Sequence, residues 1–140
     1  MKLYRAKIPT IAHECITTLT TDGDIEVEPT NREEAEQDLV AIMEEFIRRD
    51  MNFRNMIKDH MASRRIPYDQ YGRTRKRLAD ETGHPLHDDV ERFLARQFVE
   101  NLMISRFIEE VFEEDKVIYK KVIDILRGHD VDEQAILDEA

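Results

Sequence analysis

The stretch FVENLMISRFI, residues 98–108, carries the strongest indication of the fold. Seven of its eleven residues are apolar, and on a helix of 3.6 residues per turn they surround the axis instead of following one face. A helix that is apolar all round is buried in the centre of a bundle or in a subunit interface. We therefore predict a helix that begins at Asp88 and continues to Phe112. Its candidate core or interface residues are Phe98, Val99, Leu102, Met103, Phe107 and Ile108.

Apolar residues recur every three or four positions on both sides of this stretch, which is typical of amphipathic helices. Further helices are expected to begin near residues 8, 31, 50, 73 and 115. Asp50 is expected to interrupt the second of these segments, and Gly128 to end the helix that begins at Asp115 before a last short one. With only four glycines and four prolines, the chain is not a turn-rich β-protein. We predict an all-α fold, a bundle of about five to seven helices.

The length of 140 residues fits a single helical domain, residues 1–140. The turn residues Thr82–Pro85 divide it into possible halves, 1–82 and 86–140. When the chain is shifted by 65 residues, Met43–Ile47 matches Ile108–Phe112 in pattern. Either a duplicated helical hairpin or chance explains this match, since amphipathic helices resemble one another.

The composition limits the environment and the partners. The net charge is −10, and the single cysteine, Cys15, has no partner for a disulfide within the chain, which favours a reducing compartment. No apolar run is long enough for a signal peptide or a membrane span, so we expect a cytoplasmic protein without a membrane partner. An acidic chain is attracted to nucleic acid only through a local basic patch.

Such a patch lies between Arg64 and Arg77. Six cations stand there against one carboxylate, Asp69, whereas residues 81–140 carry sixteen acidic and seven basic side chains. Arginine presents a planar fork to phosphate oxygens, and tyrosine rings stack on bases. Pairing of these cations with acidic helices of the same chain or a second copy is the competing explanation. The candidate phosphate or nucleic-acid contacts are Arg64, Arg65, Arg73, Arg75, Lys76, Arg77, Tyr68 and Tyr71.

No catalytic or metal site is predicted. On a helix His13 and Cys15 point to different sides, so they do not form a nucleophile–base pair. His84, His87 and the aspartates that follow could ligate a metal, but they lack the spacing of a known zinc motif. We expect neither an enzyme nor a bound cofactor or metal.

Several short motifs carry a resemblance to a known family. They are Met1–Tyr4 with Lys7-Ile8, then Glu44–Phe46, Met61–Ser63 and Arg65–Pro67. They resemble the bacterial family known as domain of unknown function 507, best over about residues 1–80. The resemblance implies a small, soluble, largely helical bacterial protein and supplies no catalytic residues.

Together these observations favour a non-enzymatic interaction or structural module that associates with itself, as a homodimer or larger homo-oligomer, or with another protein. The alternative is a protein that binds nucleic acid or another phosphate-rich partner through Arg64–Arg77.

Overall fold

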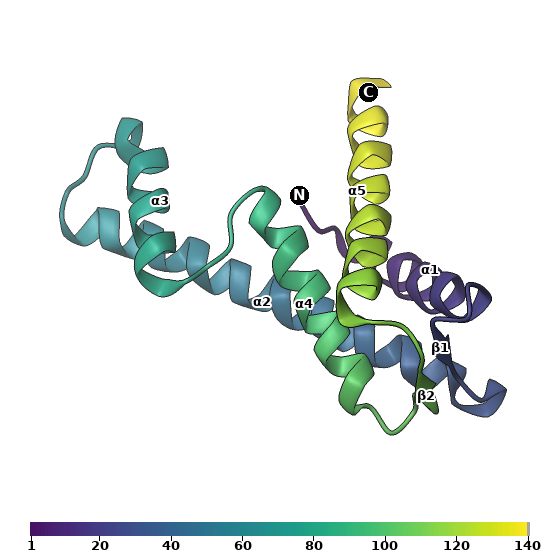
Figure 1. Cartoon of the computed structure of the whole chain (residues 1–140). Coiled ribbons are helices and arrows are strands. Elements are labelled where there is room, and N and C mark those ends of the chain that lie inside the picture. Colours follow the sequence, from purple (N-terminus) through teal and green to yellow (C-terminus); the bar gives the residue numbers. More distant parts are fainter. Residues whose placement is uncertain (140) are drawn as a thin grey trace.

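Five α-helices account for most of the computed structural model of the chain and confirm the all-α prediction (Figure 1). The structure describes the backbone of residues 1–139 and the side chains of residues 1–130. The helices are α1 (Ile8–Thr21), α2 (Arg32–Ser63), α3 (Tyr71–Thr82), α4 (Asp88–Ile104) and α5 (Asp115–Glu139). Short 3₁₀ turns precede the first three of them, at Arg5–Lys7, Pro29–Asn31 and Tyr68–Gln70.

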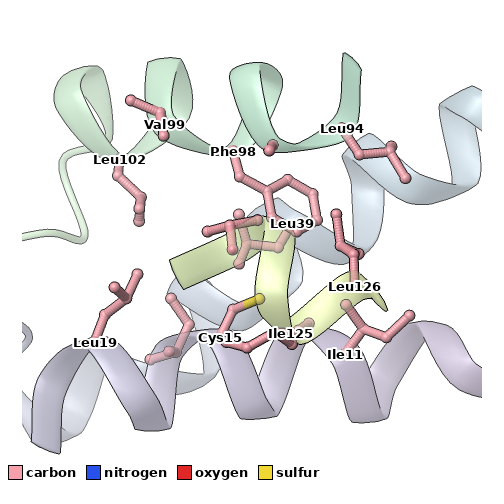
Figure 2. Close-up of a cluster of buried hydrophobic side chains, with 14 of the residues drawn as sticks. Ile11, Cys15, Leu19, Leu39, Leu94, Phe98, Val99, Leu102, Ile125 and Leu126 are labelled. Carbon is pink, nitrogen blue, oxygen red and sulfur yellow. The ribbon is translucent and has the colours of Figure 1, made fainter. Parts of the chain in front are cut away.

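The main core lies between α1, the first half of α2, α4 and α5. Figure 2 shows side chains from these four helices converging, with Ile11 and Leu19 on one side and Phe98 and Leu102 on the other. Cys15 is fully buried among them, and this burial raises the pKa of its thiol far above the usual range. Cys15 is thus a small apolar core residue in a neutral form.

The predicted helix through Phe112 is wrong at its C-terminal end, because α4 ends at Ile104. Phe98, Val99, Leu102 and Ile108 are buried as predicted, whereas Phe107 is only partly buried. Met103 and Ile104, predicted to be enclosed, are 40% and 83% exposed.

Ser105 explains where α4 ends. Its backbone is extended, and its hydroxyl donates a hydrogen bond to Asp38 Oδ2 at 2.9 Å. The hydroxyl oxygen of Ser105 also accepts a hydrogen bond from the backbone N–H of Phe107 at 3.2 Å. These local bonds compete with a further helical turn.

A two-stranded antiparallel ribbon joins distant parts of the chain. Strand β1 (Ile25–Glu26) pairs with β2 (Glu110–Val111), with Ile25 opposite Val111 and Glu26 opposite Glu110. Strand β2 falls in the segment that was predicted to be helical up to Phe112. The secondary structure also argues against an internal duplication. The 65-residue shift matches Met43–Ile47, which is helical, with Ile108–Phe112, which is not.

The predicted breaks at Asp50 and Gly128 are both wrong. Helix α2 is continuous over 32 residues, and α5 continues past Gly128 to Glu139. The side chain of Asp50 binds Arg54 at 3.1 Å and His84 at 2.9 Å instead of capping a new helix. Because α2 is unbroken, its second half extends beyond the main core and carries α3 away from α1 and α5 (Figure 1).

His84 connects this extension to the main core. Its ring is buried and stacks on Phe46 of the main core, at 6.0 Å between centroids, and on Phe53 of the extension, at 4.2 Å. The left-handed Gly83 (φ 73°) ends α3 and turns the chain so that His84 enters this position. Together with the bond to Asp50, these contacts hold the extension against the main core.

Candidate nucleic-acid interface

The second half of α2 and the whole of α3, residues 51–82, pack against each other and form a helical hairpin that we call the arm. A small apolar cluster holds its two helices together, consisting of Phe53, Ile57, Met61, Leu78 and Ala79. Figure 1 shows the arm reaching away from the rest of the bundle. The predicted basic segment, residues 64–77, forms the end of the arm and the first part of α3, and we call it the arm tip.

The end of α2 places Arg65 in an unusual backbone conformation. The N–H of Ile66 donates to the carbonyl of Met61 at 2.9 Å, and the N–H of Arg65 to that of Ala62 at 3.3 Å. These are the two bonds of a Schellman motif, which needs a left-handed residue where Arg65 stands. Arg65 adopts φ of 53°, a conformation that favours glycine and costs roughly 1–2 kcal/mol in other residues.

The cations of the arm tip lie mostly on its surface. Arg75 is partly buried, while the others are exposed, namely Arg64, Arg65, Arg73, Lys76 and Arg77. Among the side chains of residues 1–130, the tip forms one cation–carboxylate contact, Arg77 with Glu81 at 3.8 Å. That pair is an exposed i,i+4 pair, worth a few tenths of a kcal/mol. Within the described side chains, internal pairing therefore does not account for the remaining five cations.

His60 lies beside the tip, between two of these cations. Arg77 donates a hydrogen bond to His60 Nε2 at 2.8 Å, and Arg64 also reaches the ring. Loss of hydration lowers the pKa of His60, and the positive charges of Arg64 and Arg77 lower it further. The lowered pKa favours the neutral imidazole, whose unprotonated nitrogen accepts a hydrogen bond from a neighbouring guanidinium group.

Two tyrosines stand among the cations. The ring of Tyr68 stacks on that of Tyr71, with 5.8 Å between centroids and 26° between planes. Tyr71 is partly buried and packs against the small apolar cluster, whereas Tyr68 is 84% exposed. No other aromatic ring among residues 1–130 is as exposed as Tyr68. All eight residues predicted as candidate contacts thus belong to one protruding structure.

The other residue combinations considered in the sequence, a catalytic pair and a metal site, do not come together. His13 is exposed and bonds to Glu36 at 2.8 Å, while Cys15 is buried in the main core. His84 is buried against Asp50, and His87 is exposed. In the part of the chain with described side chains, no three His, Cys, Asp or Glu residues are grouped so that they could hold a metal ion.

Sequence reasoning missed the buried charges. Glu91 is buried on α4 and accepts a hydrogen bond from Arg127 of α5 at 3.0 Å. Asp24 is also buried and bonds to Lys121 at 2.6 Å, and this bond raises the pKa of Lys121, as does a second one to Asp22. The burial of Glu91 could have been predicted from the sequence. Leu94 and Phe98 follow three and seven residues later, so Glu91 lies on the same apolar face of the helix.

The fold and the tip define an all-α protein with a protruding cationic arm. The chain belongs to the family of proteins of unknown function DUF507, whose family model matches residues 1–140. The match includes the second half of the chain, beyond the motifs of the first 80 residues. Among curated proteins, no match to the chain was found. None of the helices among the described residues is both long and apolar enough to span a membrane.

Proposed function

We propose that the chain is a non-enzymatic binding module that contacts the phosphate groups of a nucleic acid through its arm tip. The observation that carries this proposal is the set of cations at the tip without a carboxylate partner among the described side chains, in a chain with a net charge of −10. Arginine forks match phosphate oxygens, and such contacts dominate the affinity of nucleic-acid binding.

The conformation of Arg65 supports the same proposal. A non-glycine residue in the left-handed region costs stability and is often retained where its side chain has a function. Here the side chain is exposed at the end of α2, next to Arg64 and three residues before Tyr68, where the next turn begins. The backbone turn therefore orients a guanidinium outward beside the other cations.

The test is the binding of fluorescently labelled oligonucleotides by anisotropy at several salt concentrations. A triple variant with Arg65→Gln, Arg73→Gln and Lys76→Gln removes three exposed cations of the tip. If all three contact phosphates of a single strand, the slope of log affinity against log salt falls by about 2. Binding at low salt is expected to weaken at least tenfold.

The matched control removes three exposed cations from other elements, with Arg5→Gln, Arg96→Gln and Lys120→Gln. Its net charge equals that of the tip variant, so a loss caused by net charge alone would affect both equally. We expect the control to retain most of the affinity and the salt slope of the wild type. Equal losses in both variants, or no binding by the wild type at low salt, would contradict the proposal.

A second candidate function is self-association between the arm tip of one copy and the connection between α4 and α5 of another. The connection and its flanks expose Ile104 and Phe112, at 83% and 63%. They also carry an acidic set that is exposed, consisting of Glu109, Glu110, Glu113, Glu114 and Asp115. This combination of apolar and acidic residues complements the cations and the exposed ring of the tip. The molar mass in solution at low and high salt tests this candidate.

A further inference from the structure

The arm tip combines its cations with one aromatic ring that the protein leaves open. Burial of an aromatic side chain is strongly favourable, so a tyrosine that is 84% exposed gives up most of that stabilisation. Tyr68 is nevertheless not free to move, because Tyr71 stacks on it and Tyr71 itself packs on the cluster between α2 and α3. The ring is thus supported from the protein side and accessible from the solvent side.

The backbone before and after Tyr68 holds this ring in place. Pro67 has φ of −63° and an extended ψ of 147°, and the 3₁₀ turn Tyr68–Gln70 begins directly after it. The N–H of Gln70 closes the turn on the carbonyl of Pro67 at 3.0 Å. Arg64 and Arg65 precede the ring, and Arg73 and Lys76 follow it on the first turns of α3. Cations thus precede and follow Tyr68 in the sequence, within the same arm tip.

Among nucleic acids, a supported aromatic ring beside cations suits unpaired bases. In a duplex each base is covered on both faces by its neighbours, and side chains reach its edges through the grooves. In a single strand the base faces are free, and stacking on an aromatic side chain contributes substantially to binding. Resting on the function proposed above, we infer that the arm tip binds single-stranded nucleic acid, with Tyr68 stacking on a base and the flanking cations contacting the backbone.

The experiment measures the binding of four probes at one salt concentration. It compares the full-length wild type, Tyr68→Ala and two control variants, together with the triple tip variant described above. The probes are labelled 12-mers of oligo-dT and oligo-U, a 12-base-pair DNA duplex and a 12-base-pair RNA duplex. We expect the wild type to bind the single strands more tightly than the duplexes. Tyr68→Ala is expected to weaken single-strand binding about 5- to 150-fold, the range for loss of one base stack. Duplex binding is expected to change less than twofold.

Two further variants separate the ring from other effects. Tyr68→Phe keeps the ring and is expected to bind the single strands like the wild type. Tyr4→Ala removes another tyrosine ring, one that is partly buried and lies outside the arm, and is expected to change nothing. Because the chain has four tyrosines and no tryptophan, quenching of tyrosine fluorescence by oligo-dT gives a second readout that Tyr68→Ala should reduce.

The outcomes distinguish this inference from the function on which it rests. If Tyr68→Ala binds single strands like the wild type while the triple tip variant does not, phosphate binding stands and base stacking is refuted. Tighter binding of either duplex than of the matching single strand would also refute it. If the wild type binds none of the four probes at low salt, both proposals fall. A preference for oligo-U over oligo-dT would identify RNA as the partner, and the reverse would identify DNA.

Discussion

Arg65 is the residue at which stability and the proposed function oppose each other. Its left-handed backbone costs roughly 1–2 kcal/mol. Glycine would remove that cost but lose more conformational entropy on folding, which costs about 0.5–1 kcal/mol. We expect Arg65→Gly to raise the free energy of unfolding by roughly 0.5–1 kcal/mol, as measured by urea denaturation. The same variant should bind oligonucleotides several-fold more weakly, because one phosphate contact is lost.

Arg64→Gly is the control for this prediction. Arg64 precedes the left-handed position and has φ of −104°, which any residue adopts, so glycine relieves nothing there. We expect that variant to lose stability instead of gaining it. If Arg65→Gly is less stable than the wild type, the turn at the end of α2 carries no strain.

At the same scale, the sequence predicted the chemistry of the tip better than its geometry. The residue types between Arg64 and Arg77 were enough to nominate every candidate contact. Nothing in the sequence indicated that Arg65 is left-handed, because glycine or asparagine is the usual residue there. The neutral state of His60 also depends on contacts with Arg64 and with Arg77, seventeen residues away, which spacing on one helix cannot reveal.

Between elements, the contact of α4 with α5 includes one buried charge. The carboxylate of Glu91 is 4% exposed and has Arg127 as its partner. We expect Arg127→Met to lower the free energy of unfolding by about 3 kcal/mol in urea denaturation, because it leaves a buried carboxylate without a partner. The double variant with Glu91→Leu and Arg127→Met should recover most of that loss, since an apolar pair replaces the ion pair.

An exposed ion pair on the same helix provides the comparison. Arg92 contacts Asp89 at 3.0 Å, and both side chains are exposed. Arg92→Met should therefore cost less than about 0.5 kcal/mol. A loss in Arg127→Met no larger than that in Arg92→Met would mean that water, and not Arg127, compensates the charge of Glu91.

The helices themselves were largely predictable, and the errors have local causes. Spacing of apolar residues identified α1 and the beginning of α4, because each of these helices buries an apolar face in the main core. It failed after Ile104, where apolar residues continue but the hydroxyl of Ser105 ends the helix. It also failed for β2, because a two-residue strand depends on its pairing with the distant β1 and has no pattern of its own.

For the molecule as a whole, self-association makes a prediction about mass and salt. If the tip of one copy binds the acidic connection of another, light scattering should give a molar mass above 16.6 kDa at low salt. The mass should fall toward 16.6 kDa as salt rises, since charge attraction is screened. A variant with Ile104→Ser and Phe112→Ser should remain at the lower mass under all conditions.

Met51→Ser serves as the control, because Met51 is another exposed apolar residue but lies outside both surfaces. It is expected to associate like the wild type. A mass of one chain for the wild type at every salt concentration would eliminate this candidate and leave the nucleic-acid proposal untouched.

The arrangement of the chain as one domain, or as halves 1–82 and 86–140, stays a prediction.

The continuous helix α2 affects the electrostatics of binding at the arm tip. The thirteen residues from Met51 to Ser63 rise about 20 Å along the helix axis, more than twice the screening length of about 8 Å at physiological ionic strength. The negative charges of the main core are therefore largely screened from a ligand bound at Arg64 and Arg65, at the far end of this helix segment. At about 0.01 M salt the screening length grows to about 30 Å, and repulsion from these charges reaches the ligand. Dilution of salt should then stop improving affinity, so the most favourable ionic strength is an intermediate one.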